Sequence, residues 1–211
     1  MGLLTFVRRP TTGLLSDAEL FGRAHAMNDK PEAGSETSNP LTTCPANLQV
    51  TKNGNDIDIT GTINFRRGDY DPKTHQPVLL EGEVDPNLVS TYLGWMNTIW
   101  TNPAGKYHVT THLRQGPNGV SAYVGNPVIG GEAADLGGPN LYLAPPDALG
   151  RNAHDRNLAA HGLGHIFGNR HGRGLMNPFP QVNGSGGGLF EEHIDELLKR
   201  CGLLSKDAVQ P

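Results

Sequence analysis

The sequence contains little cysteine: only Cys44 and Cys201 occur among its 211 residues. A scaffold held together by several disulfides is therefore excluded. The two thiols could form one disulfide in an oxidising compartment, or both could stay free, and their spacing does not choose between these states. Cys44 could also bind a metal as a thiolate, although a disulfide or a buried thiol is the more common fate of such a residue.

Long apolar runs and an excess of positive charge are also missing. The apolar stretch at residues 3–7 is too short for the apolar region of a signal peptide or for a membrane span. The formal net charge is -4, so the chain has no basic footprint for nucleic acid or an anionic membrane. We therefore expect a protein or a small molecule as the partner.

Glycine and proline are abundant, with 28 and 16 residues, which indicates long irregular connections. Residues 1–46 are interpreted as a leading segment and linker, because residues 29–46 are rich in proline, serine, threonine and charge. Within the leading segment, Ser16 and Glu19 form a capping box that predicts a short helix. Residues 47–211 are long enough for one compact domain.

The first half of this domain alternates between strand and helix patterns. Apolar residues alternate on both sides of Asn53-Gly54, which predicts a hairpin. Asp85-Pro86 begins a helical pattern with an apolar stripe that continues to Ile99. Further strands are predicted within residues 106–113, 120–125 and 139–146.

Two helices are predicted in the second half. Asn152, with Asp155 three residues later, is a good N-cap for the first of them. The last helix is predicted from about residue 189 to 201, with Gly202 as its stop. The element order of strand, helix, strands, helix, coil and helix predicts an α+β domain of α/β layered type.

Three histidines on and after the first of these helices have the spacing of metal ligands. His161 and His165 lie one helical turn apart, so both imidazoles can reach one ion. Gly168 allows the left-handed backbone that commonly ends a helix, and the turn can bring His171 back as a third ligand. Three histidines leave a fourth position for water, as in catalytic zinc sites. Because the apolar residues fall on the opposite side of the helix, we expect the histidines to face a cleft.

This segment resembles the active-site region of the metzincin clan of zinc endopeptidases, whose motif is H-E-x-x-H-x-x-G-x-x-H followed by a methionine turn. The run NLAAHGLGHIFG is especially similar to the active-site helix of the matrixin branch. The run GLMNP at residues 174–178 resembles the methionine turn, with Met176 beneath the metal. The positions that match the motif in register are His161, His165, Gly168 and His171.

The resemblance implies a metzincin-like zinc protease fold. Such a fold has a twisted mixed sheet, an active-site helix, a methionine turn and a C-terminal helix, with a deep cleft between a sheet-bearing part and a smaller C-terminal part. It also implies zinc as the metal, and a protein or peptide substrate that pairs with an edge strand within residues 117–125. Residues 47–211 would then form the metallopeptidase domain.

The chain departs from the clan at Gly162, which stands where the motif has its glutamate. In the family this glutamate is the general base, and losing such a base typically costs a factor of about 10² to 10⁴ in rate. Glycine inside a helix also costs about 1 kcal/mol relative to alanine, so helix propensity gives no reason for it. The resemblance therefore implies a zinc endopeptidase by family that in this chain binds zinc but barely hydrolyses peptides.

Loss of the base suggests deliberate or selected inactivation of a harmful protease, so Gly162 could be engineered or natural. By analogy, the chain would be the C-terminal toxin domain of a bacterial secreted effector, delivered outside the producing cell, with an immunity or inhibitor protein as a partner. One alternative is a natural pseudoprotease that binds zinc and a protein partner without cleavage. Another is a structural zinc module with a fourth ligand such as Cys44 or a further histidine.

The other polar residues receive ordinary interpretations. The tripeptide Arg67-Gly68-Asp69, followed by Asp71, predicts a polar turn. Four histidines outside the motif register are expected at the surface, in caps or on a solvated strand face, namely His108, His112, His154 and His193. Three acidic residues of the last helix are not expected to replace the missing base, namely Glu191, Glu192 and Asp195.

Overall fold

The computed structural model describes residues 44–71, 73–74, 76–125, 132–134, 137–145, 152–177 and 188–204. Most of the predicted leading segment and linker, including the helix predicted at Ser16, lies outside these residues. The elements in chain order are η1 (Pro45–Asn47), β1 (Gln49–Asn53), β2 (Asp56–Asp71), β3 (Gln76–Leu79), α2 (Pro86–Trp100), β4 (Pro103–Ala104), β5 (Tyr107–Gln115), β6 (Val120–Val124), β7 (Glu132–Ala134), β8 (Asn140–Leu143), α3 (Asn152–Ile166), η3 (Gly174–Met176) and α4 (Glu191–Arg200), where η marks a 3₁₀ helix.

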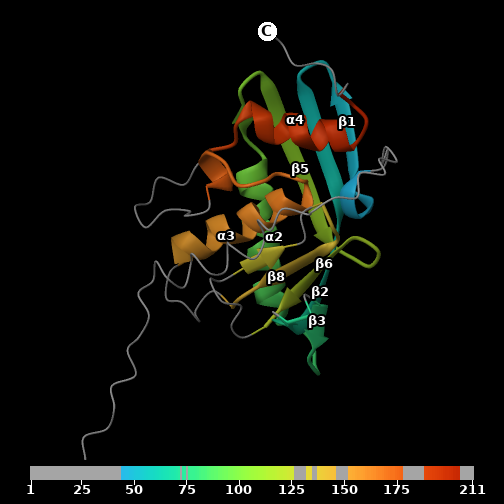
Figure 1. The fold of residues 1–211 in the computed structure, drawn as a ribbon, viewed down its shortest axis with the longest axis vertical. Coiled ribbons are helices and arrows are strands. Elements are labelled where there is room, and N and C mark those ends of the chain that lie inside the picture. Colours follow the sequence, from blue (N-terminus) through green and yellow to red (C-terminus); the bar gives the residue numbers. More distant parts are fainter. Residues whose placement is uncertain are drawn as a thin grey trace, which may run out of the picture.

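The strands form a twisted mixed sheet in the order β4-β5-β2-β6-β8-β7, and β1 and β3 also pair with β2 (Figure 1). The pairs β5–β2, β2–β6 and β6–β8 are parallel. The remaining pairs, which include β7 with β8, are antiparallel. With three described helices, the chain has the mixed α+β architecture that the sequence predicted.

The local predictions for the hairpin and for the helix after it are confirmed. β1 and β2 form an antiparallel hairpin around Gly54, whose φ of 60° lies in the left-handed region that glycine tolerates. Helix α2 begins after Asp85, whose carboxylate accepts a hydrogen bond from the backbone N–H of Asn87 at 2.9 Å. Its buried stripe ends on Trp100 rather than on the predicted Ile99, which is only half-buried.

Two predictions about strand placement are wrong. β6 lies between β2 and β8, so residues 117–125 contain an interior strand and not the expected edge strand. Residues 67–69 continue β2 instead of forming a polar turn, with Gly68 opposite Leu79 across the ladder. The turn begins only after Asp71, whose carboxylate accepts hydrogen bonds from the Lys73 backbone and the Thr74 hydroxyl. Sequence patterns did not reveal either pairing, because strand partners are chosen by long-range contacts.

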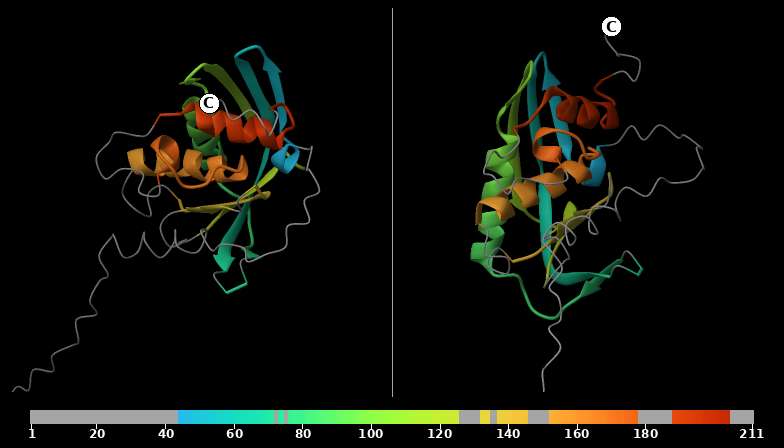
Figure 2. Two further views of the ribbon diagram at one scale, coloured as in Figure 1. Left: turned by 45° about the horizontal axis from the view of Figure 1, so that its top comes forward. Right: turned by 60° about the vertical axis from the view of Figure 1, so that its left-hand side comes forward.

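The sheet and all three helices contribute side chains to one buried cluster. α3 lies between α4 and β8 in both figures (Figures 1 and 2), and it contacts α2, β7, β8 and η3. Trp100 joins α2 to α3, because its indole N–H donates to the carbonyl oxygen of Ala160 at 2.9 Å and its ring lies 4.5 Å from that of Phe167. The helix that carries the histidines is therefore enclosed by packed elements.

Cys44 and Cys201 form a disulfide, which resolves the alternatives that the sequence left open. The bond links the start of the described fold to the residue that caps α4. That helix spans Glu191–Arg200, close to the predicted 189–201, and Gly202 follows it with a φ of 68° as the predicted stop. Because both sulfurs are bonded to each other, Cys44 does not act as a thiolate ligand in this state.

Candidate metal centre

The fold brings the three predicted ligands together. One ring nitrogen from each of His161, His165 and His171 lies within 4.8 Å of the others, so the three side chains are close enough to bind one metal ion. The first two come from α3, and Gly168, with a φ of 94°, makes the predicted left-handed turn toward the third. Among the described residues, no further histidine, cysteine, aspartate or glutamate joins this group.

The ring orientations of His161 and His165 are fixed by backbone carbonyl groups. Nδ1 of His161 lies 2.7 Å from the carbonyl oxygen of Leu175, and Nδ1 of His165 lies 2.8 Å from that of Asn169. A carbonyl oxygen only accepts, so each Nδ1 carries the hydrogen, and in a neutral ring Nε2 then bears a lone pair. Carbonyl groups in this position commonly orient metal-binding histidines.

The two Nε2 atoms face each other at 3.0 Å. Two lone pairs at this distance repel unless a proton or a metal cation lies between the rings. Zinc bonds of about 2.0–2.1 Å at tetrahedral angles place two ligand nitrogens about 3.3 Å apart, close to the observed separation. The chemistry and spacing of these donors therefore fit a metal ion.

The histidines are more deeply buried than the sequence predicted. His161 is 0% exposed and His165 is 5% exposed, and every residue from 158 to 169, including Gly162, is buried. The two rings are therefore covered by the surrounding chain, and a cleft beside them stays a prediction. The helical pattern identified the apolar side of α3 correctly, but the packing of η3 against α3 also covers residues that lie outside that apolar stripe.

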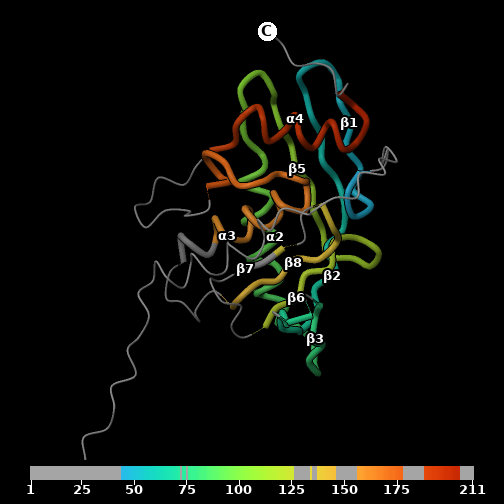
Figure 3. The backbone as a smooth tube through the Cα atoms, viewed as in Figure 1, coloured from blue at the N-terminus to red at the C-terminus, as the bar shows by residue number. Residues whose placement is uncertain are grey.

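The turn that contains Met176 packs directly on the histidine helix. After α3 the chain doubles back, so that η3 lies against that helix (Figure 3), and Met176 is 0% exposed. A Cβ atom at Gly164, between the two histidines, would overlap the sulfur of Met176 and lie 3.3 Å from Trp100 Cζ2. Gly164 therefore has a packing reason that the sequence did not reveal, because the methionine contact forms only in the folded chain.

The loop between His171 and Met176 is fastened to the first turn of α4. Arg173 binds both carboxylate oxygens of Glu192, at 2.5 and 2.9 Å, and its guanidinium lies 4.2 Å from the centre of the Phe190 ring. This hydrogen bonding lowers the pKa of Glu192 from 4.5 to about 2. The loop that carries the third histidine is therefore held from α4.

His193 takes part in capping α4, in line with the interpretation of it as a cap residue, but it is buried rather than at the surface. Its Nδ1 accepts a hydrogen bond from the Phe190 backbone N–H at 3.1 Å, and the residue is 3% exposed. Burial lowers the pKa of His193, and the nearby Glu192 carboxylate and a hydrogen bond to the Arg173 backbone oppose that shift. The neutral ring is thus the form that suits the fold.

Other predicted residues lie away from the histidine group. The Glu191 carboxylate pairs with Lys106 Nζ at 2.6 Å, and the Asp195 carboxylate accepts from the Tyr107 hydroxyl at 2.8 Å. With Glu192 bound to Arg173, none of these acids joins the three histidines. His108 and His112 are exposed on β5, as expected, and the side chain of His154 lies outside the described residues.

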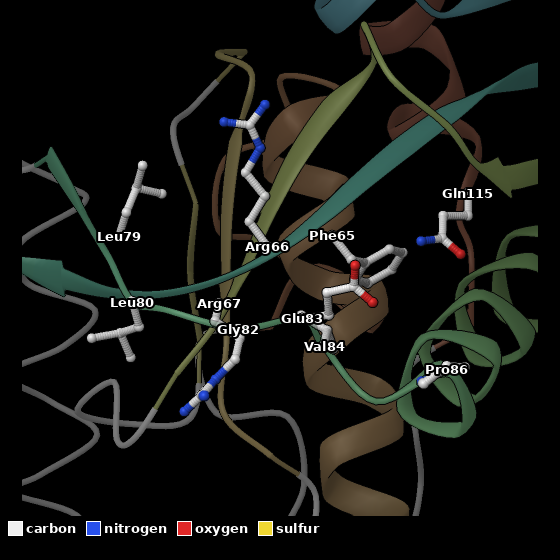
Figure 4. Close-up of a pocket in the computed structure, with 10 residues that line it drawn as sticks. All are labelled: Phe65, Arg66, Arg67, Leu79, Leu80, Gly82, Glu83, Val84, Pro86 and Gln115. Carbon is white, nitrogen blue, oxygen red and sulfur yellow. The ribbon is translucent and has the colours of Figure 1, made fainter.

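Sequence reasoning missed two features. Asn169 supplies the backbone carbonyl that orients His165. The one sign of this role in the sequence is that Asn169 directly follows the helix-ending Gly168. A pocket of about 450 Å³ also opens between the end of β2 and the chain that leads from β3 to α2, and its lining includes Phe65, Arg67 and Leu80 (Figure 4). Val78 and Leu79 on β3 are exposed. None of the pocket's lining residues belongs to the histidine group.

The chain matches no known protein family, and no curated protein matches its sequence. None of the helices in the described part of the chain has the length and apolar character needed to cross a bilayer. The function proposed below therefore rests mainly on the geometry of the histidine group.

Replacing Gly164 with alanine should not stabilise the protein, although alanine favours helices. Overpacking against Met176 costs about 1–3 kcal/mol, which exceeds or cancels a propensity gain of about 1 kcal/mol. Gly94 is the matched control, because it lies in α2, is exposed and would place a new Cβ in open space. Urea unfolding should show Gly94→Ala stabilised by up to about 1 kcal/mol and Gly164→Ala not stabilised. Equal stabilisation of both variants would contradict the packing account.

The lowered pKa of His193 predicts a loss of stability in mild acid. In the unfolded chain His193 takes up a proton near pH 6.5, whereas in the folded chain its pKa is lower. The contribution of His193 to stability is therefore complete above about pH 6.5 and declines as the pH falls toward the pKa of the folded form. His193→Gln keeps an acceptor for the Phe190 N–H without titrating. Urea unfolding from pH 5 to 8 should be less pH-dependent in this variant. Parallel profiles would refute the role of His193, because the rest of the sequence is the same in both proteins.

Proposed function

We propose that the three histidines hold a zinc ion and that the chain is a metzincin-type zinc endopeptidase that lacks its general base. The observation that carries the proposal is the pair of facing Nε2 atoms on His161 and His165, each with its Nδ1 hydrogen directed to a backbone carbonyl. This arrangement turns both Nε2 atoms toward one position, where they can act as donors to one cation. His171 supplies the third donor.

Zinc is the metal that best suits this donor set. Neutral imidazoles are borderline ligands that zinc accepts readily, and three of them leave one position for water or substrate. When bound, zinc would polarise a peptide carbonyl and lower the pKa of its water to about 7. A closed structural zinc module is less well supported, because Cys44 is in a disulfide and no fourth protein ligand joins the group among the described residues.

β7 is the strand on which an extended substrate would bind. It ends the described sheet path beyond β8, and it contacts α3, which carries two of the histidines. A peptide that pairs with the outer edge of β7 would therefore run beside the histidine helix, and its backbone would be held by strand hydrogen bonds. This proposal replaces the expectation that placed the edge strand within residues 117–125.

Gly162 determines what this chain can do with a bound peptide. Its position follows His161 directly in α3, and it has no side chain to take a proton from water. The same observation favours the second candidate, a natural pseudoprotease that binds zinc and a protein partner without cleavage. Both candidates share the metal centre and differ only in whether a base at position 162 makes it hydrolytic.

The biological setting is a further part of the proposal. A lost base suits a protease that is harmful to its producer, such as the C-terminal toxin domain of a secreted bacterial effector, with an immunity or inhibitor protein as the partner. The disulfide supports delivery outside the producing cell, because disulfides persist in oxidising compartments and are rare in the cytosol.

Zinc should bind the folded chain at a ratio of one ion per molecule. Metal analysis after dialysis, and thermal unfolding with zinc or with a chelator, measure this directly. Zinc at about 100 times its dissociation constant should stabilise the protein by about 2.7 kcal/mol, and His165→Ala should lose this effect. His108→Ala is the control, because His108 is exposed and lies outside the group. Equal zinc binding by both variants would rule out the proposed site.

Restoring the carboxylate should restore hydrolysis. Gly162→Glu is expected to cleave an unstructured protein such as casein about 10² to 10⁴ times faster than the unaltered chain, and a chelator should abolish the gain. Gly162→Gln matches the size of glutamate without its basicity and should remain inactive. If Gly162→Glu is folded and binds zinc but is no faster than Gly162→Gln, the protease proposal fails and the pseudoprotease is retained.

A further inference from the structure

Arg200, in the last turn of α4, lies across two glycines from distant parts of the chain. A Cβ atom on Gly168 would overlap its Nε and Cδ atoms, and one on Gly137 would overlap its Nη1 atom. The side chain is 35% exposed, and its Nε also donates to Glu196 at 3.2 Å. Both glycines have left-handed backbones, with φ values of 94° and 67°. The absence of side chains at these positions lets the guanidinium pack directly on the two backbones.

Both glycines are hydrogen-bonded to the same ligand residue. The backbone N–H groups of Gly137 and Gly168 donate to the carbonyl oxygen of His165, at 2.7 and 2.8 Å. This carbonyl lies in the last turn of α3, where the helix carries partial negative charge that a cation stabilises. Arg200 therefore packs over two chain segments that are hydrogen-bonded to the end of the histidine helix.

The same turn fixes the imidazole ring of His165. Asn169, which follows Gly168, accepts the Nδ1 hydrogen of His165 at 2.8 Å, and its side-chain amide donates to the His193 carbonyl oxygen at 3.2 Å. The turn is thus held from both ends of α4, by His193 near the start and by Arg200 at the end. A shift of the turn would move the acceptor that directs His165 Nε2 toward the metal position.

The disulfide fixes the part of α4 that carries Arg200. Cys201 directly follows Arg200, continues the helical hydrogen bonding to Leu197 at 2.9 Å, and is bonded to Cys44. The opposite end of the helix is fastened separately, through Glu191 to Lys106. A change at the disulfide therefore acts first on the end of α4 that contacts Gly168 and Gly137.

We propose that Arg200 is a positioning residue for the metal centre and that the Cys44–Cys201 disulfide sets metal affinity through it. The proposal rests on the histidines being metal ligands. A dithiol that reduces the disulfide breaks the S–S bond, gives two electrons and two protons to the cysteines, and itself becomes a disulfide. Arg200 then loses its covalent anchor, the turn at 168–169 loosens, and the histidines bind the metal less tightly. The centre would load in oxidising compartments and release its metal in reducing ones.

The experiment measures zinc affinity of the full chain by competition with a chromophoric chelator, at a temperature where circular dichroism shows each variant folded. Arg200→Ala and Cys44→Ser/Cys201→Ser should each weaken zinc binding by about 10- to 100-fold, as loss of an outer-shell partner does. The variant that combines these substitutions should bind zinc about as tightly as the weaker-binding of the two separate variants, because both changes act through the same contact. Arg200→Lys keeps the positive charge and the aliphatic part of the side chain, so its zinc affinity should lie between those of the unaltered chain and Arg200→Ala. Lys199→Ala removes the same charge from the neighbouring position and should leave the affinity unchanged.

A second readout separates positioning from general stability. Cobalt bound to the histidines has a visible absorption spectrum that reports ligand geometry, and this spectrum should change in Arg200→Ala but not in Lys199→Ala. A lower melting temperature with unchanged zinc affinity and cobalt spectrum would overturn the proposal, as would additive losses in the combined variant. If the variant without the disulfide does not fold, an unchanged zinc affinity in Arg200→Ala is by itself enough to overturn the proposal. Absence of zinc binding in the unaltered chain instead refutes the metal centre itself.

Discussion

The site depends on two buried imidazole rings that turn their lone-pair nitrogens toward each other. This arrangement is unfavourable without a cation between the rings, and the protein maintains it by giving each Nδ1 hydrogen a carbonyl acceptor, one from Leu175 and one from Asn169. Those carbonyls belong to η3 and to the turn after α3. η3 and the turn at the end of α3 therefore meet one shared electrostatic requirement.

The glycines near this centre serve different purposes. Gly164 makes room for Met176, and Gly168 combines a left-handed backbone with the close approach of Arg200. Gly162 stands where the resemblance places a catalytic carboxylate, and the proposed function assigns its effect to chemistry. α4 gives the centre its external support, because it contacts the loop before Met176 through Glu192 and the turn after α3 through His193 and Arg200. The disulfide then connects this support to the beginning of the fold.

Prediction from sequence succeeded where short-range physics decides the outcome. The hairpin at Gly54, the cap at Asp85 and the stop at Gly202 are each set by a few neighbouring residues, and all three are found in the structure. Prediction failed where a distant segment decides. β6 became an interior strand because β8 pairs with it, and residues 67–69 became part of β2 because β3 pairs there. The burial of the histidines depended in the same way on the return of η3.

The sequence by itself determined the identity and spacing of the three histidines, the left-handed turn at Gly168 and the absence of a carboxylate at position 162. These properties are local, because helix geometry and glycine conformation fix them within about one or two turns. Only the tertiary structure decided which nitrogen of His161 and His165 is directed to a backbone carbonyl and which faces the other histidine, since the deciding carbonyls come from other segments. It also joined Cys44 to Cys201 and placed Arg200 over two glycines, which are contacts between residues far apart in the chain.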